Sequence, residues 1–429
     1  MPPLSLNIIM PILFLLVLYF VIKPPKTLPI AAVSGFGSLL TILLGFVKLN
    51  DLNLVITTCW DAILTLIGLM LISINLEANG YFTWLAKGIL KLAKNNGFYL
   101  LILLSLLTSI TAAILANDGA VLIMTPLTFA ITKALNLKNK TAFVYLFTVG
   151  FLCDAASTPL LASNLTNILI ADAFSINYLA YARKMLLPTI AIIISTIGFA
   201  LLIFKSNIPH KFESQKTIYT HNLPINKTTI IFSSVILIAL LLEFILASFF
   251  CLPIAFIVIP SALILAIFNH KFKYLSYYTM AKKIDWFIII FAISLFIVIV
   301  GLFNSHYIDF IKTFFYLHQR SSLANNFSLE IFLSILSSIF NNLPACLVSI
   351  ITLKHLDITN VELNNIAYVS IFGTNIGSKL LPYGSLSTML WLDILKEHGY
   401  GIGWKTYFIY SIPLTIICLI IGGLIYSFN

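Results

Sequence analysis

Among the charged side chains inside apolar stretches of this 429-residue sequence are Asp118, Asp154 and Lys379. Each one stands among Asn, Gly, Ser, Thr or Pro, residues that interrupt helices. A charge buried in a membrane costs a few kcal/mol, so each of these residues needs a partner or a function. Carboxyl groups that gain and lose a proton would supply both a charge and a coupling reaction. We therefore predict Asp118, Asp154 and Lys379 as proton-coupling residues.

Each of the three also has a purely structural alternative. Asp118 could cap a helix that runs from Gly119 to Leu135, and Asp154 could cap a helix in the same way. Lys379 could extend its ammonium to the outer membrane interface. If Lys379 instead stays buried, it needs a counter-ion, which Asp118 or Asp154 would supply from the other half of the chain.

The neutral polar residues beside these charges are amides and hydroxyls. They gather at interruptions of the apolar stretches, around residues 116–119, 153–164, 341–344 and 373–385. A site with many neutral donors and acceptors suits a small polyol-like solute and suits a multiply charged anion poorly. The predicted substrate-binding residues are Asn117, Gly119, Thr158, Ser163, Asn164, Asn341, Asn342, Asn375, Ser378 and Ser385.

The remaining acidic residues and the cysteines give weaker signals. Glu243 lies in a stretch without helix breakers and is predicted as a scaffold residue, while Asp61, beside Trp60, is predicted at the membrane interface. The cysteines form neither a CxxC motif nor a disulfide framework, and no metal site or cofactor is predicted. The five cysteines are Cys59, Cys153, Cys251, Cys346 and Cys418.

The composition defines the elements that must position these residues. The chain is 60% hydrophobic and only 9% charged, whereas soluble domains carry roughly 25% charged residues. Apolar runs long enough to span a bilayer recur from end to end, and backbone groups in lipid must be satisfied within helices. The sequence therefore predicts an all-α polytopic membrane protein. Its net charge of +10 indicates a positive-inside bias rather than nucleic-acid binding.

The apolar runs predict ten spans and two re-entrant hairpins. The first run, 4–22, lacks the charged leader of a signal peptide and is predicted as a retained span. The stretch 98–135 is too long for one span, and both hairpins carry polar residues near their middles; the alternative for 98–135 is a pair of full spans, giving twelve crossings. The hairpins are 98–135 and 327–355, and the spans are 4–22, 28–47, 55–76, 141–172, 185–205, 228–247, 252–269, 286–304, 361–396 and 404–427.

The basic residues predict the orientation. With the N-terminus outside, 18 of the 25 Lys and Arg residues fall in cytoplasmic segments and six fall outside. Each half then reads as three spans, a hairpin, a broken span and a last span, in opposite orientations. The predicted domains are an N-terminal repeat (1–205, with hairpin 98–135 and broken span 141–172), a cytoplasmic linker (206–227) and a C-terminal inverted repeat (228–429, with hairpin 327–355 and broken span 361–396). Broken helices in paired positions indicate the binding site of a secondary transporter.

Four sequence blocks resemble the ArsB-type arsenite/antimonite efflux permeases, and the resemblance covers essentially the whole length. The blocks are Ala-Asn-Asp-Gly-Ala-(x)4-Thr-Pro at 116–126, Asp-x-Ala-Ser-x-Pro-Leu-x-x-Ser-Asn-Leu-x-Asn-Ile at 154–168, Asn-Asn-x-Pro at 341–344 and Gly-Ser-Leu-x-Thr-x-Leu-Trp-Leu at 384–392.

The resemblance implies a fixed scaffold, a mobile transport domain with hairpins and broken helices, and elevator-type alternating access. It also implies export of trivalent arsenic and antimony driven by protons and, for some members, a soluble arsenite-stimulated ATPase as partner. Some members have Asp where this chain has Asn375, which leaves Asp118 and Asp154 as the main proton candidates.

We therefore expect a secondary transporter of a bacterial cytoplasmic membrane, not an enzyme, that exchanges uncharged As(OH)3 or Sb(OH)3 for protons. Two alternatives remain at this stage. One is a sodium/proton antiporter or carboxylate carrier of the same ion transporter superfamily. The other is a channel subunit driven by a separate ATPase, since the chain itself has no P-loop.

Overall fold

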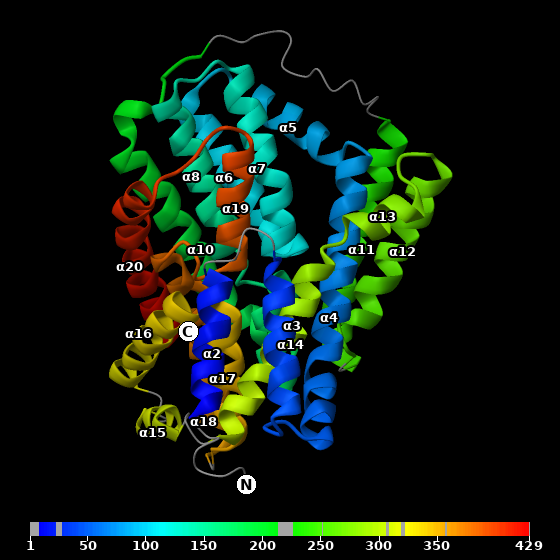
Figure 1. Ribbon diagram of the computed structural model, residues 1–429. Helices are drawn as coiled ribbons and strands as arrows, with labels where there is room; N and C mark the ends of the chain where they lie inside the picture. The colour runs from blue at the N-terminus through cyan, green and yellow to red at the C-terminus, as the bar shows by residue number, and fades with distance from the viewer. Residues whose placement is uncertain are drawn as a thin grey trace.

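The computed structural model describes residues 8–22, 28–212, 226–250, 252–305, 309–318, 322–356 and 358–428, and these residues contain helices but no strands (Figure 1). The start of the first predicted span, most of the predicted linker and Cys251 lie outside the described residues. In the first half the helices are α2 (Ile9–Ile22), α3 (Ile30–Leu43), α4 (Leu49–Ala78), α5 (Tyr81–Leu92), α6 (Gly97–Leu115), α7 (Asn117–Ala134), α8 (Asn139–Ala155), η1 (Leu161–Ser163), α9 (Leu165–Ala173), α10 (Tyr178–Ile203) and η2 (Lys205–Asn207). In the second half they are α11 (Lys227–Phe250), α12 (Ala255–Lys271), α13 (Tyr277–Lys283), α14 (Trp286–Asn304), α15 (Asp309–Leu317), α16 (Leu323–Phe340), α17 (Asn342–Lys354), α18 (Asn360–Gly377), η3 (Ser378–Leu380), α19 (Leu386–Glu397) and α20 (Trp404–Phe428).

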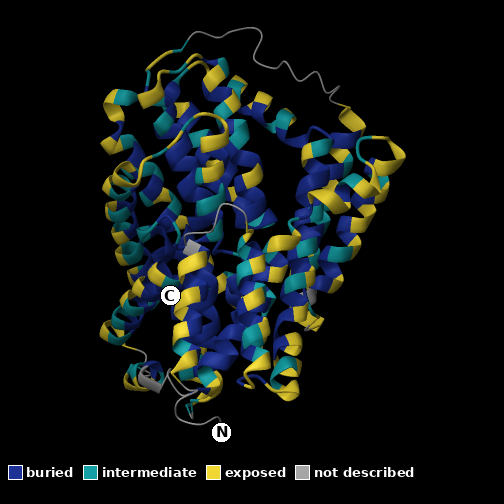
Figure 2. Ribbon diagram, viewed as in Figure 1, coloured by how far each residue is buried: buried dark blue, intermediate teal, exposed yellow. Residues whose placement is uncertain are grey.

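The helices have the dimensions and surface of membrane spans. Seven of the described helices are long and apolar enough to cross a bilayer. Figure 2 shows exposed residues on the outward faces of the helices and buried residues between them. Large apolar side chains such as Ile194, Leu202 and Phe256 are among the exposed ones. An apolar surface of this kind is favourable against lipid and unfavourable against water. The prediction of a polytopic helical membrane protein is therefore confirmed.

Two helical hairpins enter the molecule from opposite ends (Figure 1). Helices α6 and α7 turn back at Ala116, and α16 and α17 turn back at Asn341. Both turn residues have a positive φ with extended ψ: 63° and 160° at Ala116, 79° and 153° at Asn341. This region of backbone conformation is populated almost only by glycine and costs roughly 1–3 kcal/mol for other residues. The turns are therefore strained, and the packing around them must hold them in place.

Replacing Ala116 by glycine is expected to relieve the strain at the first turn. We expect Ala116→Gly to raise the free energy of unfolding by about 1 kcal/mol, because glycine adopts this conformation without a Cβ clash. Thermal unfolding of the detergent-purified protein measures the change, with Ala120→Gly in the regular part of α7 as the matched control, expected to lower stability by about 1 kcal/mol. Equal destabilisation by both substitutions would contradict the strain at Ala116.

Two predicted spans are broken at corresponding places. Helix α8 ends at Ala155, and the chain resumes as α9 after Asn164, whose side chain accepts the backbone N–H of Thr166. Helix α18 ends at Gly377, continues as the short η3 and restarts as α19 after Ser385. At Gly377 a Cβ would stand 2.2 Å from the Cα of Ser334, so only glycine lets α16 approach α18 this closely. Each break exposes helix ends and their backbone groups inside the protein.

Two groups of helices can be distinguished by their packing, and they touch where α4 packs on α9 and α14 packs on α17. In one group α3 packs on α14 and α4 packs on α12. In the other group α10 packs on α20, and each hairpin packs on a broken helix: α6 and α7 on α8, α16 and α17 on α18. The hairpin of each half also contacts the broken helix of the other half, α7 on α19 and α17 on α9. Helices of the second group therefore bring polar interruptions from both halves together.

The boundaries differ from the sequence prediction where polar residues extend a helix or a turn ends it early. Helix α4 starts at Leu49 rather than at residue 55, and α10 starts at Tyr178 rather than 185. Helix α3 ends at Leu43 rather than 47, because Gly45 adopts a φ of 77°. Hydropathy marks the apolar part of a helix, whereas hydrogen bonding carries the helix into the polar interface.

Candidate functional site

An ion pair joins the two halves of the chain at the helix breaks. The ammonium of Lys379 in η3 contacts a carboxylate oxygen of Asp154 at the end of α8, and it also donates to the hydroxyl of Thr388 at 2.6 Å. Asn117, at the start of α7, donates to the other oxygen of Asp154 at 3.1 Å. Lys379 is 1% exposed and Asp154 is 0% exposed. The ammonium thus lies inside the protein rather than at the outer interface.

The second buried carboxylate has a neutral partner. Asp118 accepts a hydrogen bond from the hydroxyl of Ser387 in α19, at 2.5 Å. Its own backbone N–H donates to the side chain of Asn117 at 3.0 Å. Within the described residues Asp118 forms no ion pair, although it is only 7% exposed. The two carboxylates therefore differ: Asp154 is compensated by a cation, and Asp118 is held by a hydroxyl.

A cluster of amides connects the two broken helices. The amide oxygen of Asn375 in α18 accepts from the hydroxyl of Thr166 at 2.7 Å and from Asn164 at 3.4 Å. The amide nitrogen of Asn375 donates to Asn167 at 2.7 Å. Asn164 also accepts from Thr166 at 3.0 Å. These neutral groups fix α9 against α18 without adding a charge.

A small cavity of about 20 Å³ lies where both hairpin tips and both breaks meet. Asn117 and Asp118 from the first tip, Asn342 from the second tip, and Asn164 and Ser385 from the breaks contribute to its wall. The hydroxyl of Ser385 is buried and has no hydrogen-bond partner in the described part of the chain. The remaining wall residues are Leu165, Thr166, Ile288, Leu343, Leu386 and Ser387. The volume is enough for about one water molecule.

Other predicted ligands lie near the breaks but do not line this cavity. The hydroxyl of Ser163 donates to the backbone oxygens of Ser157 and Leu160, and that of Ser378 donates to the backbone of Asn375. These contacts shape the breaks rather than leave a group for a solute.

Three further predicted residues have contacts of the same structural kind. The hydroxyl of Thr158 pairs with that of Thr189, and Asn341 donates to the backbone oxygen of Tyr383. Gly119 faces Ser73 of α4, whose Oγ would lie 3.3 Å from an added Cβ. Gly119 therefore matters for close packing of the first tip on α4.

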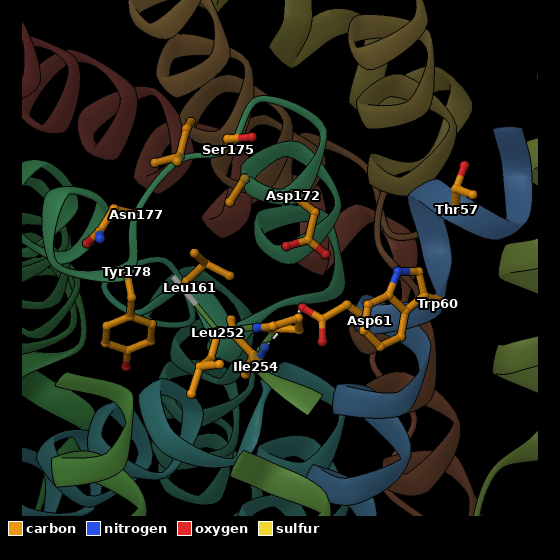
Figure 3. Close-up of a pocket in the computed structure, with 13 residues that line it drawn as sticks. Thr57, Trp60, Asp61, Leu161, Asp172, Ser175, Asn177, Tyr178, Leu252 and Ile254 are labelled. Atoms are coloured by element: carbon orange, nitrogen blue, oxygen red, sulfur yellow. Dashed lines mark hydrogen bonds between the residues drawn. The ribbon is translucent and has the colours of Figure 1, made fainter. Parts of the chain in front are cut away.

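A second pocket, of about 390 Å³, lies between α4, the end of α9 and the start of α12 (Figure 3). Asp61 and Asp172 line it from different helices. Asp61 is 4% exposed, and its carboxylate accepts the backbone N–H groups of Ile254 and Ala255. Asp61 thus caps the start of α12 and joins α4 to α12. This pocket touches neither hairpin tip and is not the site predicted from the sequence.

Sequence reasoning missed several residues of the site. Ser387, Thr166 and Asn167 all bond to predicted site residues, yet they stand inside regular helical segments with no breaker beside them. Thr166 and Asn167 follow Asn164 by two and three residues, and Ser387 follows Ser385 by two, and these short spacings offered no distinct signal. Glu330 in α16 was also missed, although it is 3% exposed.

The described cysteines are not part of the cavity. Cys59, Cys153, Cys346 and Cys418 are all buried, and none of them lines it. Cys346 donates to the backbone oxygen of Thr166 at 3.6 Å, and Cys153 lies within α8. The candidate site is therefore built from carboxylates, amides and hydroxyls.

Hairpin tips and helix breaks that meet around a polar cavity, inside a bundle of apolar helices, define a multi-pass membrane protein of the transporter class. The chain belongs to the ArsB family, described as "Arsenical pump membrane protein", whose family model matches residues 9–427. The family resemblance seen in the sequence blocks is thus confirmed. The predicted location, a bacterial cytoplasmic membrane crossed several times, is confirmed as well.

Individual relatives agree with this assignment. The chain is 30% identical to an arsenical pump membrane protein of Escherichia coli over 405 residues, which is 94% of each chain. It is 29% identical to a putative arsenical pump membrane protein of Bacillus subtilis over 424 residues, covering 94% of this chain and 96% of the relative. Among solved structures it resembles the YdaH transporter of Alcanivorax borkumensis, with a TM-score of 0.53, 12% identity and coverage of 99% and 97%. That likeness concerns the fold alone.

Proposed function

We propose that this protein exports uncharged As(OH)3 and Sb(OH)3 from the cytoplasm in exchange for protons. The observation that carries the proposal is the cavity at the hairpin tips, where amides and hydroxyls surround a single carboxylate without an ion-pair partner. Neutral donors and acceptors match a solute with three hydroxyl groups. Membership of the arsenical pump family supports the choice of solute.

The two carboxylates have different tasks in this proposal. Asp154 is the counter-ion of Lys379 in this form of the site, and the pair joins the two halves. Asp118 lies on the cavity wall and carries the transported proton. A proton on Asp118 removes the acceptor that As(OH)3 uses and leaves a neutral site. Proton and solute therefore compete for one position.

Competition is sufficient to couple the two fluxes. A proton from outside displaces the solute and neutralises the site for its return; release of that proton inside frees Asp118 to bind As(OH)3. Each ligand shifts the equilibrium between the inward-facing and outward-facing states only by the difference between its affinities for the two states.

We further propose that the site moves as part of a mobile group of helices. The group with both hairpins and both broken helices would slide against the group built from α3, α4, α12 and α14. In an inverted repeat, α3 of the first half corresponds to α12 of the second, and α4 corresponds to α14. The contact of α3 with α14 should then recur as a contact of α12 with α4, and both contacts are present.

The purified protein in proteoliposomes tests the proposal. With an acid lumen, the cytoplasmic side outward and no ATP, radiolabelled arsenite is expected to accumulate, and a protonophore is expected to abolish the accumulation. Dependence on a sodium gradient would instead indicate a sodium-coupled carrier. A strict need for ATP and a soluble subunit would indicate a channel driven by an ATPase.

Replacing all five cysteines by serine or alanine is expected to leave arsenite flux within about twofold of the wild-type value. A twofold change in rate corresponds to a small change in activation free energy. The physical reason is that the described thiols do not line the cavity, and a tight thiolate complex would release its cargo slowly. Flux through the cysteine-free protein in proteoliposomes measures this. Lost flux in a well-folded variant would overturn hydroxyl-based recognition.

A further inference from the structure

A row of buried polar residues follows one face of α16. Asn326, Glu330, Ser334 and Ser338 stand four residues apart and are all buried. This face packs on α18, where a Cβ at Gly373 would lie 3.0 Å from the backbone oxygen of Glu330. The proposed function assigns no task to this row.

The carboxyl of Glu330 lies at the centre of a helix junction. On α20, a Cβ at Gly423 would stand 2.3 Å from its Oε2 atom, so α20 leaves space for the carboxyl only because residue 423 is glycine. Its Oε1 atom is buried and has no hydrogen-bond partner among the described residues. An ionised carboxylate in such a place is costly, and a bound proton removes that cost.

The outer end of the row reaches the surface through a polar cluster. Asn365 donates to Asn326 at 2.9 Å, and the hydroxyl of Tyr426 donates to Asn365 at 2.9 Å. Asn365 and Ser427 are partly exposed at the end that the distribution of Lys and Arg places outside the cell. Lys184 of α10 lies 4.6 Å from the centre of the Tyr426 ring.

The inner end of the row reaches the ion pair. Ser338, about 12 Å along α16 from Glu330, donates to the backbone oxygen of Gly377, immediately before η3. From α20, the hydroxyls of Tyr407 and Ser411 donate to the backbone oxygen of Lys379. The row therefore connects the outer surface to the element that carries Lys379.

Two more polar atoms along this path lack a protein partner. The hydroxyls of Ser370 in α18 and Thr415 in α20 are buried and unpaired in the described part of the chain. Buried polar groups in proteins normally have hydrogen-bond partners. These two hydroxyls and the Glu330 carboxyl lie on three helices that pack on one another, and they are groups that can bind or pass on a proton.

We propose that Glu330 is a proton-binding residue on a relay from the outer surface to the Lys379–Asp154 pair. The proposal rests on proton-coupled export. Glu330 takes a proton from the outer water, and the hydroxyls of α16, α18 and α20 pass it inward to the site. While the Asp154 carboxylate is paired with Lys379, as in this structure, it cannot accept an arriving proton. The closed ion pair thus prevents the relay from short-circuiting the proton gradient.

Replacing Glu330 by glutamine tests the relay, because glutamine keeps the shape but binds no proton. We expect Glu330→Gln to slow gradient-driven arsenite uptake into proteoliposomes about tenfold, within the usual effect of a lost proton-transfer group. Arsenite counterflow without a pH gradient should remain within about twofold, because exchange needs no net proton movement. Glu243→Gln is the matched control, since Glu243 of α11 accepts from Ser261 and lies away from the row; it should change neither rate.

Two further variants keep the test decisive. Glu330→Asp still titrates and should recover part of the lost rate. Thr415→Val removes a hydroxyl with little change of volume and should slow only the gradient-driven rate. Wild-type uptake in Glu330→Gln and Thr415→Val would overturn the relay, and so would an equal loss of counterflow, which assigns Glu330 to packing. Failure of the proposed function is distinct, because the wild-type protein itself would then show no gradient-driven uptake.

Discussion

Arsenite accumulation driven by a proton gradient is expected to fall at least about a hundredfold when Asp118 is replaced by asparagine, because the site then lacks its titrating group. Asparagine keeps the size and the hydrogen-bonding capacity toward Ser387, so the fold should survive. Arsenite binding gives a second readout: acid should weaken it in the wild-type protein, where protons compete, and should leave it unchanged in the variant.

Ser387→Ala is the matched control for this prediction. It removes the hydrogen bond to Asp118 and leaves the carboxyl in place. Its uptake should remain proton-driven, with a changed rate. If Asp118→Asn accumulated arsenite like the wild-type protein, Asp118 would be only the cap of α7, and the proton would have to bind elsewhere.

The second large effect is expected at the ion pair. Lys379→Met leaves Asp154 buried beside Asn117 without its cation, a situation that costs about 3–5 kcal/mol. We expect the single variant to accumulate poorly in the membrane and to unfold at a markedly lower temperature. Adding Asp154→Asn removes the unpaired charge and should restore most of the stability, because a neutral pair of similar volume often equals a buried ion pair.

A double-mutant cycle on thermal stability measures this coupling. Lys354→Met is the control, since the ammonium of Lys354 donates to the neutral hydroxyl of Thr58, at 3.4 Å. Additive effects of the substitutions at 154 and 379 would show that the pair does not hold the halves together.

Much of the architecture could be predicted because helix breakers in a membrane protein are costly and therefore conspicuous. The predicted hairpins 98–135 and 327–355 compare with Gly97–Ala134 and Leu323–Lys354 in the structure. The turns lie at or beside polar residues near the middle of each hairpin, Asn117 and Asn341. The breaks after Ala155 and Gly377 were visible for the same reason.

The partners across the site could not be predicted, because they depend on how distant helices pack. Nothing in the sequence pairs Asp118 with Ser387 rather than with Lys379, since the segments are separated by more than 250 residues. Glu330 escaped notice because its stretch has serines and asparagines at helical spacing, which also fits a helix facing water. The packing of Gly373 against its backbone and of Gly423 against its carboxyl places it in the interior.

The pairing of Asp154 with Lys379 also constrains how this protein is made. The two residues are 225 positions apart, and ribosomes add roughly 5–20 residues per second, so Asp154 waits about 10–45 seconds for its cation. During that interval Asn117 is the partner already synthesised. We therefore expect the final burial of a charged Asp154 to follow the synthesis of the second half, so that the two halves close around the ion pair together.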